Sequence, residues 1–149
     1  MQITLSKEQY ENLVRLIYLG NWMVNAIHSG SKGDKQIEKY NAIEQLIFSS
    51  AKEAGLERWV EYDEESKEFF PTRRFDEDKE INEYREEYNN HTFWEELFYN
   101  LVERDMTELY GQDYVEKMSF KERIEKEEPF RRKYDKELEG YGIERFKIQ

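Results

Sequence analysis

One segment of the chain is apolar on nearly every side when it is read as a helix. It covers residues 13–27, where most side chains are apolar and only four positions are polar or glycine. Ser6 precedes the segment at an N-cap position, and Gln9 three residues later completes a capping box. A helix that is apolar all round is normally buried by the rest of its fold. We therefore expect a central, buried first helix, in which Gly20 permits close packing against another element.

Two further helices are indicated in the next part of the chain. A single apolar stripe over residues 37–54 predicts a second helix, with Asp34 as its cap and Gly55 at its C-terminal end. The short turn at residues 29–33 would let this helix pair antiparallel with the first. Asp76 is expected to open a third helix, because acidic residues in a first turn complement the helix dipole.

The last third of the chain reads as helical as well. A fourth apolar stripe covers residues 94–109 and ends at Gly111. Ser119 begins another capping box and should start a helix. Proline removes a backbone donor and is tolerated in the first helical turn, so Pro129 is placed as the first residue of a new helix. This reading gives four to six helices in all.

Strand signals are few and short. Aromatic and β-branched residues near 59–70, divided by a polar cluster, predict a small hairpin. Short alternating patterns at Ile3–Leu5 and Ile143–Ile148 predict two terminal strands that can pair with each other. The fold class that follows is mostly α, with α+β character at the margins. Without a linker or a repeat, we expect a single compact domain over residues 1–149.

Several classes of protein are excluded by what the sequence lacks. There is no cysteine, which removes disulfides, thiolate metal sites and cysteine nucleophiles. The N-terminal residues have no basic region followed by an apolar run, so no signal peptide is predicted. The longest apolar region is too short and too polar to span a bilayer. We expect a cytoplasmic protein with no membrane association and no cofactor.

The negative charge of the chain is concentrated in its middle. The formal net charge is −11, yet residues 1–60 carry seven acidic and seven basic side chains. The segment from residue 61 to residue 105 supplies most of the imbalance. Such a surface repels nucleic acid and anionic membrane, and it attracts basic partners. We therefore expect no direct binding to nucleic acid, and a basic protein or a second copy of the chain as the partner.

One constellation has the composition of a metal site. Glu87, His91 and Glu95 are spaced four residues apart, so on an unbroken helix they share a face, and Asp105 falls in the same angular range. Two carboxylates and one imidazole are ligands that divalent metals accept. The alternative function that follows is a metal-dependent enzyme built on these four residues, although a non-catalytic protein fits the chain better.

The same residues have a structural interpretation, which we favour. Thr92 and Glu95 form a capping box, and Asn89-Asn90 just before it is a natural place for a helix to end. A helix end at this point would place His91 in a turn, and the three side chains would then no longer lie on one face of a single helix. A third interpretation is a continuous helix in which His91 bonds to a neighbouring glutamate.

Aromatic residues are interleaved with the acidic ones in the middle of the chain. One hypothesis is an acidic, aromatic docking surface, which makes the protein a non-catalytic interaction or accessory module. A second hypothesis is an acidic mimic of DNA that blocks a DNA-binding protein. The plainer alternative is that the rings face the core and only the charges face water. The rings concerned are Phe69, Phe70, Tyr84, Tyr88, Phe93 and Trp94.

Overall fold

The computed structural model describes residues 3–28 and 37–147. It confirms a mostly helical fold with one small hairpin. The chain divides into two compact units, residues 1–86 and residues 87–149, and each unit is treated by itself below. The expectation of a single domain stays a prediction. The turn at residues 29–33 and the cap Asp34 lie outside the described residues.

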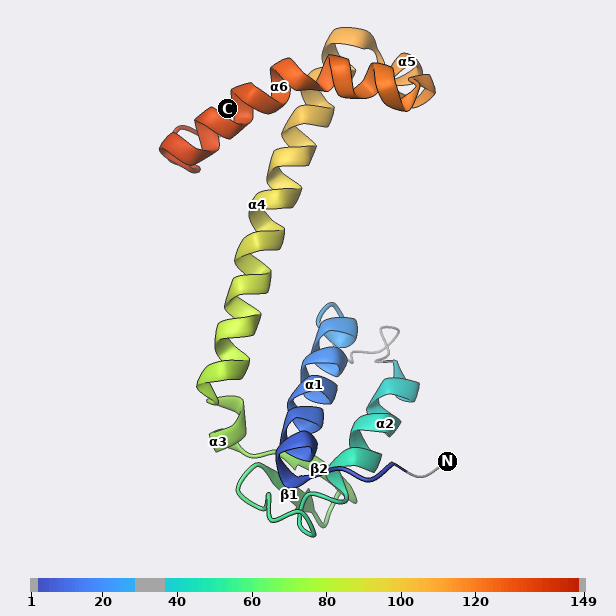
Figure 1. The fold of residues 1–149 in the computed structure, drawn as a ribbon, viewed down its shortest axis with the longest axis vertical. Helices are drawn as coiled ribbons and strands as arrows, with labels where there is room; N and C mark the ends of the chain where they lie inside the picture. Colours follow the sequence, from blue (N-terminus) through green and yellow to red (C-terminus); the bar gives the residue numbers. More distant parts are fainter. Residues whose placement is uncertain (1–2, 29–36, 148–149) are drawn as a thin grey trace. The chain divides into compact units, whose positions relative to one another are not determined.

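The first unit contains two helices, a hairpin, a short helix and the beginning of a long one. The helices α1 and α2 lie side by side and run antiparallel, as predicted (Figure 1). In chain order the elements are α1 (Lys7–Asn25), α2 (Glu38–Phe48), β1 (Val60–Asp63), β2 (Glu68–Pro71), α3 (Arg73–Asp76) and α4 (Lys79–Tyr110).

The start of α1 follows the predicted capping box. Ser6 Oγ accepts from the Gln9 backbone amide at 3.2 Å, and Gln9 Oε1 accepts from the Ser6 amide at 2.8 Å. The prediction of a central helix, however, is wrong. Val14 and Asn25 are the buried residues of α1, and Leu16 remains 66% exposed. Within the first unit, α2 and the α3–α4 region pack on neighbouring flanks of α1, and among the described residues the helix also has exposed apolar side chains.

The hairpin near residues 59–70 is confirmed. β1 pairs antiparallel with β2, with Val60 opposite Pro71 and Asp63 opposite Glu68. Asp63 holds the turn, since its carboxylate accepts from both the amide and the hydroxyl of Ser66 at 2.7 Å. This local bonding is typical of an aspartate at the start of a turn.

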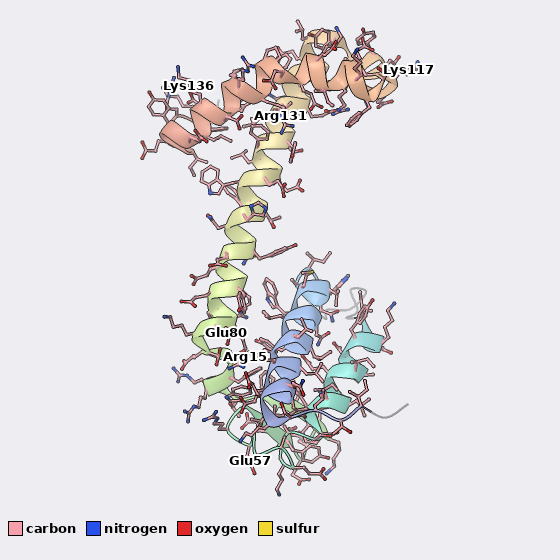
Figure 2. All side chains as sticks on the ribbon, in the orientation of Figure 1. Arg15, Glu57, Glu80, Lys117, Arg131 and Lys136 are labelled. Carbon is pink, nitrogen blue, oxygen red and sulfur yellow. The ribbon has the colours of Figure 1, made fainter. Side chains whose placement is uncertain are left out.

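The core of the first unit is built around Phe75, which is completely buried. Its ring lies 5.2 Å from the rings of Tyr18 and Trp59, with an edge-to-face arrangement toward Tyr18. The guanidinium of Arg15, on α1, lies over the Trp59 ring. The same group forms an ion pair with Glu80, in which Arg15 Nε lies 3.4 Å from Glu80 Oε2 (Figure 2). The remaining buried members are Val14, Phe48, Ala51, Leu56, Val60 and Ile81.

Two predicted helix boundaries in this unit are wrong. α2 ends at Phe48, and Gly55, with φ of 72°, instead closes an irregular turn that delivers the buried Leu56 to the core. Asp76 ends α3 rather than opening a helix. The residues that cap the helices here are Thr72 and Asp78. Thr72 Oγ1 accepts from the Phe75 amide at the start of α3, and Asp78 Oδ1 accepts from the Ile81 amide at the start of α4.

The second unit combines the rest of α4 with α5 (Gln112–Lys117) and α6 (Phe120–Tyr141). The favoured break at Asn89-Asn90 is wrong, because α4 runs unbroken through it. Asn90 Oδ1 accepts from Trp94 Nε1 at 3.1 Å, so this side chain bonds along the helix instead of competing for its backbone. The predicted end at Gly111 is confirmed by its φ of 85°.

Pro129 lies inside α6, so its prediction as a helix start is wrong, whereas the predicted start at Ser119 is confirmed. Proline within a helix costs about 3 kcal/mol. Contacts on both sides of it offset this cost. Before it, Lys126 Nζ lies 4.4 Å from the centre of the Tyr110 ring; after it, Tyr134 is buried. The buried cluster of this unit is Leu101, Val102, Met106, Val115 and Tyr134.

The terminal strands are also wrong for the described residues. Residues 3–5 have no regular structure, and residues 143–145 form a turn in which the Phe146 amide donates to the Ile143 carbonyl at 3.0 Å. The backbone groups thus bond locally instead of forming a ladder, and Ile148 lies outside the described residues. Within residues 3–28 and 37–147, no helix has both the length and the apolarity needed to cross a membrane.

Candidate functional site

The four predicted metal ligands all lie on α4, in the second unit. Glu87, His91 and Glu95 share one side of this unbroken helix. His91 Nε2 lies 3.6 Å from Glu95 Oε2, which is too far for the hydrogen bond of the third interpretation, although the continuous helix of that interpretation is present. Asp105 is about 15 Å further along the axis than Glu95. No three acidic or histidine side chains in the described ranges are placed to hold a metal ion, and the metal-dependent enzyme stays a prediction.

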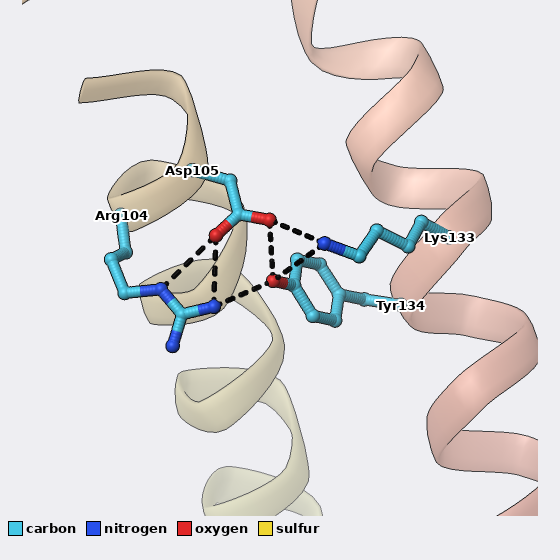
Figure 3. A network of polar contacts seen from close by, with 4 residues as sticks. All are labelled: Arg104, Asp105, Lys133 and Tyr134. Atoms are coloured by element: carbon cyan, nitrogen blue, oxygen red, sulfur yellow. Dashed lines mark hydrogen bonds and ion pairs between the residues drawn. The ribbon is translucent and has the colours of Figure 1, made fainter. Parts of the chain in front are cut away.

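Asp105 has a different environment, in which it links α4 to α6 (Figure 3). Its Oδ2 accepts from the Tyr134 hydroxyl at 2.6 Å and from Lys133 Nζ at 2.7 Å, and its Oδ1 accepts from Arg104 Nη2 at 2.8 Å. Burial by itself raises the pKa of this carboxyl, but the hydrogen bonds from the three donors outweigh burial and lower it to about 2. The cluster is therefore a structural connection within the second unit.

The aromatic residues of the acidic region are more exposed than the favoured interpretation predicts. Phe70, Tyr84, Tyr88 and Phe93 are exposed by between 41% and 51%, and only Phe69 and Trp94 are partly buried. Much of this surface belongs to α4, whose sequence has nine acidic and three basic residues. The idea that all these rings face the core is wrong, and an acidic, aromatic surface stays a candidate for binding.

One hollow in the described part of the chain lies beside residues 3–6, the first half of α1, the end of α2 and the turn after it. It is an open groove of about 1140 Å³, and its apolar lining includes Leu5, Tyr10, Leu13, Leu16, Ile47 and Ala54. A second hollow of about 220 Å³ is lined by Leu16, Ile17, Gly20, Asn21, Val24, Tyr40 and Ile43. The two linings share Leu16, so the hollows lie next to each other at this side chain. We call the surface that contains both hollows the α1–α2 face and define it by Leu13, Leu16, Gly20, Tyr40, Ile43 and Ile47.

The α1–α2 face is continued by exposed side chains at helical spacing. Met23 is 51% exposed and lies three residues beyond Gly20 on α1, and Ile27, in the turn after α1, is 85% exposed. Within the helix, steps of three and four residues connect Leu13, Leu16, Gly20 and Met23, which is the pattern of a helix that packs against another helix. Soluble monomers rarely leave a continuous apolar surface of several hundred Å² open.

Gly20 is the point of closest possible approach on this face. A Cβ built at this position would meet nothing within 4 Å, so the close packing expected there is not provided by this part of the chain. A glycine inside a helix costs about 1 kcal/mol relative to alanine. The described residues offer no internal contact that offsets this cost.

Hydrogen bonds among the side chains of Asn21, Asn25, Asn41 and Glu44 connect α1 with α2, and we call this network the polar seam. Asn25 is buried; its Nδ2 donates to Asn21 Oδ1 at 2.7 Å and to Asn41 Oδ1 at 3.2 Å. Asn21 Nδ2 donates in turn to Glu44 Oε2 at 2.9 Å. Polar groups that are buried but bonded specify a single register between two helices. The seam therefore holds both apolar stripes on one surface.

Glu44 is half-buried in this seam, and burial raises the pKa of its carboxyl to about 7, against a smaller lowering by the bond from Asn21. The pKa of Glu44 in the folded protein lies above the unfolded value of 4.5. Ionising this carboxyl therefore lowers the free energy of unfolding; the loss is absent at low pH, where the carboxyl is protonated in both states, and grows until the pH passes about 7. We expect Glu44→Gln to stabilise the protein at pH 8 by about 1–2 kcal/mol, after solvent screening is allowed for.

The check is urea unfolding of both proteins at several pH values. The gain should vanish below about pH 4.5, where the carboxyl is protonated in both states. Glu57→Gln, at an exposed position labelled in Figure 2, is the matched control and should stay within about 0.5 kcal/mol. A Glu44→Gln gain that is the same at every pH would show that charge is not its cause.

Comparison of the chain with protein-family models, with curated proteins and with solved structures gives no significant match. The functional candidates therefore rest on the geometry alone. The strongest is the α1–α2 face, which sequence reasoning missed although the signal was present. The alternating steps of three and four residues from Leu13 to Met23 mark one side of α1, and the abundance of apolar residues on its other sides obscured them.

Proposed function

We propose that this protein is a non-catalytic interaction module that holds an apolar helical partner on the α1–α2 face. The observation that carries the proposal is the pair of open hollows that meet at Leu16, one lined by Leu13 and Ile47 and the other by Tyr40 and Ile43. An amphipathic helix laid in a groove is a common mode of protein recognition.

The energetics of such binding come from apolar burial. Leu16 and Ile43 are exposed by 66% and 46%, so a partner helix would remove much of their apolar area from water. Each Å² contributes about 25 cal/mol before the costs of association are subtracted. The polar seam of Asn21, Asn25 and Glu44 keeps the two helices in place before binding, which lowers the ordering cost.

A second candidate is the binding of a basic protein to the acidic, aromatic surface of α4. It is favoured by the exposure of Tyr84, Tyr88 and Phe93 among acidic residues. Salt distinguishes the two candidates, because screening weakens an attraction between surface charges and leaves apolar contacts largely intact. Binding that persists at high salt supports the α1–α2 face.

The experiment is photo-crosslinking with p-benzoylphenylalanine at position 16 of the full chain. Position 109 is the control, since Leu109 is 64% exposed, nearly as much as Leu16, and lies on α4. The proposal predicts a covalent adduct from position 16 that is stronger than that from position 109 and is lost when Ile43→Glu is added. Equal labelling at the two positions would refute it.

A further inference from the structure

The α1–α2 face has properties that restrict its partner, and this step rests on the proposed function. Lys7 and Glu53 are the charged residues that line the groove among those described, and they have opposite signs. The segment containing both helices, residues 1–60, has no net charge. The whole formal charge of −11 lies in residues 61–149.

This distribution argues against two classes of partner. The charged side chains that line the groove among the described residues, Lys7 and Glu53, have opposite signs, so a basic amphipathic helix finds no net negative charge in this lining. An anionic membrane surface binds helices that have basic flanks. The same described lining offers such a surface no net positive charge. The surface suits a partner that is itself apolar and locally neutral.

We infer that the partner is a second copy of this chain, with the α1–α2 faces of the two copies packed together as a four-helix bundle. A two-fold axis places the same patch on both sides of an interface, so a patch that is apolar and neutral is complementary to itself. Opposite charges such as Lys7 and Glu53 can then pair across the axis. Two antiparallel helix pairs are the usual components of such a bundle.

Gly20 gives the inference a second, independent support. It is exposed within α1, and a Cβ there would meet nothing within 4 Å. In a bundle, this position lets the backbone of α1 approach a helix of the other copy closely. Leu16 on one side of Gly20 and Met23 on the other are spaced to interdigitate with the partner's side chains.

The length of the two helices limits the size of the interface. A standard interface buries about 800 Å² on each partner. α1 has 19 residues and is about 28 Å long, whereas α2 has 11 residues and is about 16 Å long, so the α1–α2 face fits a small interface and a weak dimer. The exposed large side chains that line its two hollows are Leu5, Leu16, Tyr40 and Ile43.

The test is sedimentation velocity of the full chain from about 1 µM to about 200 µM, a range that covers interfaces of this size at the weak end. The wild type should change from monomer to dimer as concentration rises. Gly20→Arg should raise the dissociation constant by on the order of 100-fold, because the long side chain stands where the other helix must lie. Gly140→Arg is the matched control, since Gly140 is also an exposed helical glycine with open space around it.

A second pair of variants guards against misfolding. Leu16→Glu should prevent the dimer, whereas Leu109→Glu should not, and circular dichroism should show all four variants folded. A wild type that stays monomeric, or a dimer that Gly20→Arg and Leu16→Glu leave intact, overturns the inference. If the wild type is monomeric while position 16 still crosslinks to another protein, this inference fails and the proposed function stands. Without any specific crosslink, both fail.

Discussion

Replacing Phe75 by alanine is expected to lower the free energy of unfolding by about 3–5 kcal/mol, the largest effect of any single substitution considered. Phe75 is completely buried and its ring contacts those of Tyr18 and Trp59. The substitution removes a large apolar side chain and leaves a cavity between α1 and the hairpin, which these aromatic neighbours cannot fill without leaving their own positions.

Urea unfolding followed by tryptophan fluorescence measures this loss, because Trp59 lies in the same cluster. The matched control is Phe120→Ala: Phe120 is 82% exposed, so the same chemical change there should cost no more than about 0.5 kcal/mol. Hydrogen exchange in α1 and α2 should become faster in Phe75→Ala. Similar losses for the two phenylalanines would contradict the assignment of Phe75 to the core.

Asp105→Ala is expected to destabilise the second unit by about 2 kcal/mol. The carboxylate accepts hydrogen bonds from Tyr134, Lys133 and Arg104, and its removal leaves the buried Tyr134 hydroxyl without its acceptor. Lys133 and Arg104 are more than half exposed, so solvent screens their share and the effect is smaller than the shifted pKa alone would give.

The pH dependence of this contribution has a definite sign. The folded pKa of Asp105 is about 2, below the ordinary value of 3.8. The stabilisation is therefore fully present above about pH 4 and is lost as the pH falls toward 2. Thermal unfolding of Asp105→Ala and wild type should differ at pH 7 and converge near pH 2. Glu108→Ala, at an exposed acid on the same helix, is the control, and a difference that persists at pH 2 would contradict the role of the carboxylate charge.

The features that could be predicted from the sequence are those determined by short-range chemistry. The capping box of Ser6 and Gln9, the hairpin after Trp59 and the helix end at Gly111 all depend on bonds or backbone angles within a few residues. Such signals are complete in the local sequence, and the structure contains each of them. They predict the fold class and the antiparallel pairing of α1 with α2, but not which side of α1 is buried.

Two of the errors are helices that continue where local propensity predicts an end. Asn89-Asn90 lies inside α4, where Asn90 Oδ1 accepts from Trp94 Nε1 one turn further on, and Pro129 lies inside α6. In α6, Lys126 before Pro129 and Tyr134 after it make tertiary contacts, and these contacts stabilise the helix against the low helix propensity of proline. Tertiary contacts of this kind routinely override intrinsic helix preferences.

The candidate site shows a different limit of sequence reasoning. Apolar residues on nearly every side of α1 predict a helix that is covered on all sides. They do not tell whether the cover comes from the same chain or from another one, since both remove the same area from water. Among the described residues, Val14 is completely buried, whereas Leu16 is 66% exposed. The acidic residues Glu87 and Glu95 gave a conspicuous pattern, but Asp105 lies too far along α4 to join them.

The most direct measurement is the photo-crosslinking comparison between positions 16 and 109, made on purified protein at rising concentration and read by intact mass. The α1–α2 face predicts an adduct from position 16 with twice the chain mass of 18.3 kDa, which increases with concentration and disappears when Gly20→Arg is added. An adduct of equal yield from both positions, or none from position 16 at any concentration with or without cell extract, would contradict the assignment of this face to binding.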